Sequence, residues 1–370
     1  MTEFNLFIAE DDDNVIDGYK SNIDSYNATN QQIRIVCTIE KDKDVAIQIL
    51  KNTDNSYDGA IIDLDLKQSG GTDSSGNEIV KEIKNNLRFP VFVISGTTHN
   101  LDPELRSESI FFKVRERDVQ FDYIEEFISI FNTGITHILG RKGTINEYLN
   151  KIFWNHLSGT MNTWVSDTLR TPEHKQKSLL RYTLLHIQEY LELTEESNFE
   201  DYHPAEIYLL PPVKNKVFTG DLVTEKSTSK NFIVLTPSCD LAQSKAKDIL
   251  LGEIESESEG LLNEKIGIVK RGTANAEVLQ GAEKDLKALI GNSYSNKYHF
   301  LPKYSSLGSG LINFQKLKSV RVRDFETNFD RIASINSNFT KDIIARFSYY
   351  YSRQGSPDFN TTEIYNSLIQ

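Results

Sequence analysis

The sequence has few cysteines and no long hydrophobic run. Its 370 residues contain 2 cysteines, Cys37 and Cys239, and neither has the spacing of a metal-ligand motif. No apolar run approaches the roughly eighteen residues that span a bilayer, and the N-terminus, Met-Thr-Glu-Phe, lacks a basic region before an apolar one. We therefore expect a cytoplasmic protein with no membrane segment and no disulfide framework.

An excess of basic charge is also missing. Lys and Arg number 41 against 53 Asp and Glu, a net charge of −12. Residues 1–135 carry 13 basic and 25 acidic residues, so subtraction from the totals leaves 28 of each in the rest of the chain. The C-terminal part thus lacks the strongly basic signature of a nucleic-acid-binding domain, and we find no helix-turn-helix with a basic recognition helix. Whether the protein binds nucleic acid stays open.

What the sequence does contain is a series of short apolar runs that end on polar residues. The runs are residues 6–9 before Glu10 and Asp11, residues 59–62 before Asp63, residues 91–94 before Ser95, and residues 110–112 before Lys113. Helical patterns alternate with these runs, which predicts an α/β fold with a doubly wound parallel sheet. Since the carboxyl ends of parallel strands share one edge, carboxylates, a hydroxyl and an amine are expected to meet there.

This ordered set resembles the receiver domain of two-component response regulators, over about residues 1–130. Clustered carboxylates need a cation, and oxygen ligands suit Mg²⁺. The resemblance implies that Glu10, Asp11, Asp63 and the backbone carbonyl of Asp65 hold the metal, and that Asp63 accepts the phosphoryl group. It further implies that Lys113 and Ser95 contact the phosphoryl oxygens, and that a sensor histidine kinase or a phosphotransfer protein is the partner.

The sequence departs from the family pattern at three places. Lys113 is followed by Val114, where receivers usually carry a proline. Ile110 stands where an aromatic switch residue is usual, and residues 67–75 make a longer loop than the family has. A divergent receiver with altered coupling is one interpretation. A degenerate receiver in an interaction protein that is not phosphorylated is another.

At this length the chain is expected to form two or three domains. We predict a receiver domain at 1–133, a helical segment at 134–205, and a β-rich α+β output domain with a small barrel-like sheet at 206–370. The helical segment could join two copies in a homodimer, carry a signal, or form the helical part of the output domain's core.

Two features of the C-terminal part suggest chemistry. Residues 220–223 and 230–237 resemble the small-barrel RNA-cleaving toxins of bacterial toxin and antitoxin pairs, without the arginine expected in their active site. Cys239 and Asp240 follow a predicted strand, where a thiol can be activated by a base, and His203 or His299 could supply that base from elsewhere in the fold. The alternative is that Cys239 is a small buried hydrophobe.

A basic stretch near residue 320 completes the set of candidate sites. Its cations are Lys316, Lys318, Arg321 and Arg323. They could meet phosphate or the acidic receiver, or form a solvated face. The sequence as a whole predicts a response regulator of a phosphorelay with an unusual output region. Whether the protein is an enzyme stays open: the output is either an interaction module or a phosphorylation-gated effector such as a nuclease.

Overall fold

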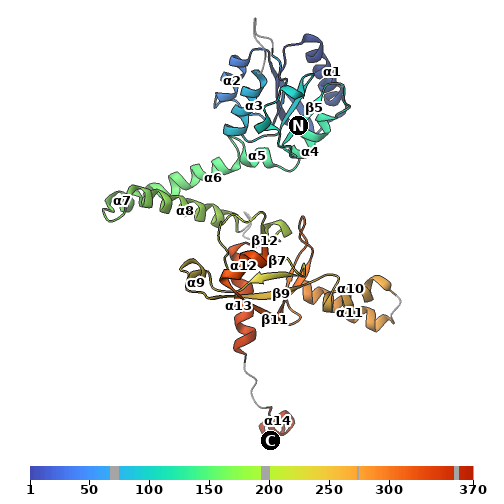
Figure 1. Cartoon of the computed structure of the whole chain (residues 1–370), viewed down its shortest axis with the longest axis vertical. Coiled ribbons are helices and arrows are strands. Elements are labelled where there is room, and N and C mark those ends of the chain that lie inside the picture. The colour runs from blue at the N-terminus through green and yellow to red at the C-terminus, as the bar shows by residue number, and fades with distance from the viewer. Residues whose placement is uncertain (67–74, 193–200, 273–274, 354–357, 370) are drawn as a thin grey trace. The chain divides into compact units, whose positions relative to one another are not determined.

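The computed structural model describes residues 1–66, 75–192, 201–272, 275–353 and 358–369 (Figure 1). The chain divides into two compact units, Met1–Phe199 and Glu200–Gln370. The finer division at residues 133 and 205 stays a prediction. Within the described ranges, every helix is too short or too polar to cross a bilayer.

The first unit begins with five parallel strands that alternate with helices. The strands are β1 (Thr2–Ala9), β2 (Ile33–Glu40), β3 (Gly59–Ile62), β4 (Val91–Ser95) and β5 (Phe112–Glu116). The helices are α1 (Asp13–Thr29), α2 (Lys43–Lys51), α3 (Ser75–Asn86) and α4 (Tyr123–Phe131), with 3₁₀ turns at Thr98–Asn100 and Pro103–Leu105. The strand order is β2-β1-β3-β4-β5. This is the flavodoxin-like order of doubly wound sheets, and it confirms the predicted fold class.

Helices cover both faces of this sheet, which explains why its central strands β3 and β4 are buried along their whole length. Helices α2 and α3 lie over one face and α1 and α4 over the other (Figure 1). All four residues of β3 are buried, so side chains on both faces enter a core. Phe92 stacks on Phe127 of α4 with ring centroids 4.0 Å apart. A Cβ on Gly59 would come within 2.8 Å of Phe127, so the strand needs glycine there.

The fifth strand begins later than the sequence suggested. The predicted run of residues 110–112 is mostly outside β5, because Ile110 is 59% exposed and Phe111 is 46% exposed. A backbone bridge between Ser109 and Phe112 turns the chain just before the strand. Residues after Lys113 therefore form most of β5, and the strand ends at Glu116.

After α4 the first unit continues as helices. These are α5 (Ile135–Leu139), α6 (Thr144–Ile152), a π-helical turn (Phe153–Leu157), α7 (Ser158–Ser166) and α8 (Pro172–Leu191). Thr171 caps α8 by accepting a hydrogen bond from the N–H of His174, and Pro172 occupies the first turn, where its fixed φ suits a helix start. No residue of the twenty in α8 is buried. Its Leu180, Leu184 and Leu191 are each more than half exposed.

The second unit is built on a curled antiparallel sheet of order β10-β11-β9-β8-β7-β12-β6. The strands are β6 (Tyr208–Leu209), β7 (Asp221–Glu225), β8 (Asn231–Val234), β9 (Asp248–Ser256), β10 (Tyr298–Leu301), β11 (Gly310–Arg321) and β12 (Phe329–Ile335). The helices are α9 (Ser238–Ala242), α10 (Gly260–Arg271), α11 (Ala276–Ile290), α12 (Val322–Asn328), α13 (Ser337–Ser352) and α14 (Thr361–Ile369), with a 3₁₀ turn at Pro204–Ile207. Helix α13 packs on one face through Ile343, whereas α10 and α11 form a hairpin beside the sheet (Figure 1).

Candidate phosphoacceptor site

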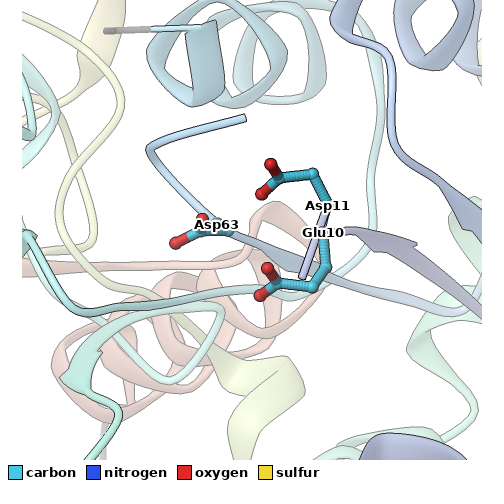
Figure 2. A group of neighbouring side chains, drawn as sticks. All are labelled: Glu10, Asp11 and Asp63. Atoms are coloured by element: carbon cyan, nitrogen blue, oxygen red, sulfur yellow. The ribbon is translucent and has the colours of Figure 1, made fainter. Parts of the chain in front are cut away.

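Three carboxylates meet at the carboxyl edge of the parallel sheet. The strand register places Ala9 opposite Ile62, so Glu10 and Asp63 follow neighbouring strands at the same level. The Asp63 N–H donates to the carbonyl of Ala9 over 2.9 Å, which fixes this level. Oxygens of Glu10, Asp11 and Asp63 all lie within 4.8 Å of one another. Figure 2 shows the three side chains gathered at this one place, from the ends of β1 and β3.

A glycine allows α3 to close against the backbone of the central aspartate. A Cβ on Gly76 would lie 2.3 Å from the carbonyl oxygen of Asp63 and 2.6 Å from the Cα of Leu64. Both atoms are backbone, so they have little room to move. The Gly76 N–H donates to the carbonyl of Leu64 over 3.1 Å. Gly76 therefore helps to hold the segment that carries Asp63 against the start of α3.

The cation that reaches these carboxylates is Arg117. Its Nη2 lies 2.6 Å from Oε2 of Glu10 and 3.0 Å from Oδ2 of Asp63. The register of β4 and β5 explains this placement, because Ser95 at the end of β4 lies opposite Glu116 at the end of β5. Arg117 is the next residue, so its side chain starts from the same edge as the carboxylates. A guanidinium can bond two carboxylates at once, since its donors form a planar fork.

The structure corrects the expected position of Lys113. This residue lies inside β5 opposite Phe92, three residues before the strand ends. Its ammonium group bonds Oε1 of Glu126 in α4 over 2.6 Å. The apolar run in the sequence indicates a strand that starts two residues too early, and this error places Lys113 at the edge. With β5 in its observed place, Lys113 lies within the strand beside α4, and the cation at the carboxyl edge of the sheet is Arg117.

Hydroxyl groups supply the other polar contacts at this edge. Ser95 is buried, and its Oγ accepts a hydrogen bond from the N–H of Thr97 over 3.2 Å. The hydroxyl group of Ser95 also lowers the pKa of the neighbouring Asp63 carboxyl group. The Asp65 carboxylate accepts from the Thr97 hydroxyl and from the Asn100 amide. The assignment of the Asp65 backbone carbonyl as a metal ligand stays a prediction.

Burial disfavours the charged form of two of these carboxyl groups. Glu10 is 1% exposed and Asp63 is 3% exposed. Burial raises the pKa of Glu10 to about 7, although the N–H of Asp12 and the Arg117 guanidinium favour its charged form. Burial likewise raises the pKa of Asp63 above its usual range, against the opposing effects of Ser95 and Arg117. One guanidinium thus compensates only part of the charge collected here.

The site fits a divalent cation. The Oδ1 atom of Asp63 is buried and has no hydrogen-bond partner within the described ranges of the chain. A buried carboxylate oxygen without a partner is unfavourable, and a cation would satisfy it. The donor set consists of carboxylates, which suits Mg²⁺. Glu10, Asp11 and Asp63 are the residues that would hold it.

Arg117 was not among the site residues predicted from the sequence, although the sequence contains a signal for it. Residues 114–117 read Val-Arg-Glu-Arg, so the β-compatible run continues past Lys113 with another basic residue at its end. The expected loop of residues 67–75 lies largely outside the described residues. The role of Gly76 was not predicted from the sequence, because its close contact with the Asp63 backbone is set by tertiary packing.

Cys239 and Asp240 do not form a recognisable catalytic group with the residues that the structure describes. Cys239 is exposed rather than buried, and its Sγ lies 3.7 Å from Oδ1 of Asp240, the residue that follows it. His299 is buried on β10 with its Nδ1 3.5 Å from Asp342 of α13, and burial lowers its pKa to about 4. His203 caps the 3₁₀ turn at Pro204–Ile207 by accepting from Ala205. His203 thus has a local role at its own turn, whereas Nδ1 of His299 is buried and has no hydrogen-bond partner among the described residues.

The cations of the basic stretch are paired within the second unit. Lys316 bonds Glu255 over 2.9 Å, and Lys318 bonds Glu225. Arg321 lies 3.3 Å from Asp248 across the β9–β11 ladder, and Arg323 lies 3.5 Å from its neighbour Asp324. Each positive charge therefore has an acidic partner, which favours the solvated face over a phosphate-binding surface.

Comparisons with known proteins find likeness in solved structures. The N-terminal domain of a three-domain response regulator, sensory-box and GGDEF protein from Carboxydothermus hydrogenoformans is 15% identical and covers 36% of this chain and 92% of its own, with a TM-score of 0.25. The phosphorylated cyanobacterial phytochrome response regulator RcpA is 17% identical over 37% of this chain and 94% of its own, with a TM-score of 0.23. The Salmonella typhimurium response regulator RcsB is 14% identical over 50% and 93%, with a TM-score of 0.27.

No protein-family model matches the chain, and no curated protein matches it. The neighbours are response regulators, and their likeness covers only the N-terminal part. At such low identity and TM-score, the fold assignment rests on the topology of the parallel sheet itself. The second unit stays without an assigned relative.

The raised pKa values predict how stability depends on pH and metal. Without metal, the folded chain binds protons at Glu10 and Asp63 more tightly than the unfolded chain does. The Glu10 contribution is complete below about pH 4.5 and is lost as the pH rises through about 7, because the folded state must then ionise a buried group; the raised pKa of Asp63 acts in the same direction. Thermal unfolding in EDTA should therefore show a falling midpoint over that window.

Magnesium should reverse this loss, since it competes with protons for the same oxygens. We expect MgCl₂ to raise the unfolding midpoint of the first unit at pH 8 and to change it little at pH 5. Glu10→Gln should flatten the metal-free profile and weaken the response to Mg²⁺. A wild-type midpoint that is independent of pH, or a Mg²⁺ effect of equal size at both pH values, would contradict this account.

Proposed function

We propose that the first unit is a phosphoacceptor receiver and that Asp63 takes the phosphoryl group. The observation that supports this most is the juxtaposition of Glu10, Asp11 and Asp63 with the Arg117 guanidinium at the carboxyl edge of a parallel sheet. A buried carboxylate with a hydroxyl and a guanidinium beside it has what phosphoryl transfer requires: a nucleophile, and donors for the phosphoryl oxygens. The role assigned to Lys113 from the sequence passes to Arg117 in this proposal.

The transfer is a displacement at phosphorus. A carboxylate oxygen of Asp63 forms the new O–P bond while the bond between phosphorus and the donor's leaving group breaks. The leaving group keeps the electron pair and takes a proton from water. When bound, Mg²⁺ neutralises charge on the phosphoryl oxygens. Arg117 would leave Asp63 to bond a phosphoryl oxygen, and Ser95 would donate to another.

The partner that we propose for this chemistry is a phosphohistidine donor. A sensor histidine kinase or a phosphotransfer protein would supply the phosphoryl group, and the added charge would shift an equilibrium between two conformations of the receiver. A cytoplasmic location fits such a partner and stays a prediction.

For the output we favour an interaction module. Helix α8 keeps an apolar side in solvent, with Leu180 and Leu184 each more than half exposed, and Trp154 in the π-helical turn Phe153–Leu157 is 69% exposed. Exposed apolar side chains at this density are typical of interaction surfaces, and a homodimer is one form that such an interaction could take. DNA interaction, which is described for RcsB, has less support here because the basic stretch is paired internally.

An effector enzyme is the second candidate, based on Cys239. We expect the phosphorylated chain to leave RNA and nucleotides intact, because the group that accepts from the Cys239 thiol is the weakly basic carboxylate of Asp240. Product analysis after incubation with RNA, compared with Cys239→Ala, tests this. Turnover that Cys239→Ala abolishes would restore the nuclease hypothesis.

Substitution of the proposed nucleophile gives the first test of the receiver. Asp63→Asn should abolish labelling by a small phosphodonor such as acetyl phosphate in the presence of Mg²⁺, because an amide oxygen is a far weaker nucleophile. Asp13→Asn is the matched control, since Asp13 is an exposed carboxylate at the same edge. Labelling should be measured by mass spectrometry of the intact protein. Equal labelling of wild type and Asp63→Asn would refute the assignment.

The assignment of Arg117, rather than Lys113, as the cation that contacts the phosphoryl group gives a second test. Arg117→Ala should slow phosphorylation from acetyl phosphate by about 10²-fold or more, as expected for the loss of one donor to a charged transition state. Lys113→Ala should leave the rate nearly unchanged, because its ammonium group pairs with Glu126. If Lys113→Ala slowed phosphorylation more than Arg117→Ala, Lys113 would be the residue that contacts the phosphoryl group.

A further inference from the structure

An apolar cavity lies at the end of the receiver sheet opposite to Asp63. Its volume is about 360 Å³. It is lined by the end of α3, the first residues of β4 and β5, the turn before β5, and α5: Ile83, Lys84, Leu87, Arg88, Val91, Ser107, Ser109, Phe111, Phe112, Ile135, Thr136 and Leu139, with Phe89 and Pro90. Cavities of this size with mostly apolar walls are typical of small-molecule sites.

The charged residues at this cavity are both cationic. Among the residues that line it, Lys84 and Arg88 carry charge and none is acidic. The Lys84 ammonium lies 3.6 Å from the ring centroid of Phe112 and donates to the carbonyl of Leu105. Arg88 donates to the carbonyl of Leu139 over 3.0 Å. Both cations bond only neutral oxygens in these contacts, so their charge stays available to an anion.

A buried hydroxyl group without a partner provides an independent observation. Thr136 lines the cavity and is 4% exposed, and its Oγ1 has no hydrogen-bond partner among the residues that the structure describes. Buried hydroxyl groups normally bond something. Arg88 contacts Leu139, one helical turn after Thr136, so the guanidinium and the hydroxyl belong to the same side of the cavity. That side can receive a polar group.

We propose that this cavity binds a medium-chain carboxylate. The apolar chain would fill the space between α3 and α5, and the carboxylate would bond Lys84, Arg88 and the Thr136 hydroxyl. At roughly 30 Å³ for each non-hydrogen atom, the cavity holds about a dozen such atoms, which is the size of decanoate. The charge of the lining residues selects an anion over a neutral alcohol of the same length.

The position of the cavity gives the ligand a regulatory role. Helix α5 is the first element after the receiver helices, and Gly134 at its start has a φ of +77°. A ligand in contact with both α5 and the sheet would favour conformations in which α5 is packed against the receiver. Binding would thus influence how the receiver connects to α6 and α8, independently of phosphorylation.

Calorimetric titration of the full chain tests the proposal with decanoate and decanol, both below their aggregation range. Decanoate should bind one site with a Kd of about 10–100 μM, the range expected for a dozen non-hydrogen atoms. Decanol should bind about tenfold more weakly. Lys84→Gln with Arg88→Gln should weaken decanoate about tenfold and leave decanol unchanged. Lys20→Gln, which removes an exposed charge on α1, is the matched charge control and should change neither.

Two further variants show whether binding is at this place. Leu139→Trp should fill the cavity and abolish binding. If that variant fails to fold, Thr136→Val keeps the shape and removes the unpartnered hydroxyl: it should unfold at a temperature equal to or above that of wild type, with a smaller rise on addition of decanoate. No binding by wild type, equal binding of decanoate and decanol, or undiminished binding by folded Leu139→Trp would overturn the proposal. So would an undiminished rise with Thr136→Val.

Discussion

The bridge that Arg117 makes between Glu10 and Asp63 is the interaction on which the candidate site depends. Parallel strands bring these two carboxylates to one edge, where burial penalises their charge. Removing either partner from a buried ionic group leaves an uncompensated charge, which is strongly destabilising. The guanidinium is therefore a structural counterion in the resting chain. In the proposed function, its bonds would be redistributed on binding of a metal or a phosphoryl group, and this would couple the chemistry to β5.

Much of the first unit could be predicted because its signals are local. The runs before Glu10, Asp63 and Ser95 are apolar on both faces, as strands between two helical layers must be, and each ends where its polar residue begins. Because the strands are parallel, their carboxyl ends lie at the same edge of the sheet. The carboxylates of the site follow directly from this pattern.

The edge cation could not be assigned in the same way. The residues at 110–112 look like a strand, but Ile110 and Phe111 are exposed beside a turn, and only the pairing of β4 with β5 decides where the strand ends. Because the strand ends four residues later than predicted, the cation at the edge of the sheet is Arg117 and not Lys113. In the second unit the predicted β-rich character was right, whereas the pairing of the basic stretch with Glu225 and Glu255 depends on contacts between strands far apart in the sequence.

The central claim is that Asp63 is phosphorylated in this pocket. The most direct measurement is to treat the chain with acetyl phosphate and Mg²⁺, reduce it with borohydride, and sequence the peptides by mass spectrometry. Reduction converts an aspartyl phosphate to homoserine and leaves free carboxylates unchanged. The account predicts homoserine at position 63 and none at Asp11 or Asp65. Homoserine at another position, or none in a chain that binds Mg²⁺, would contradict it.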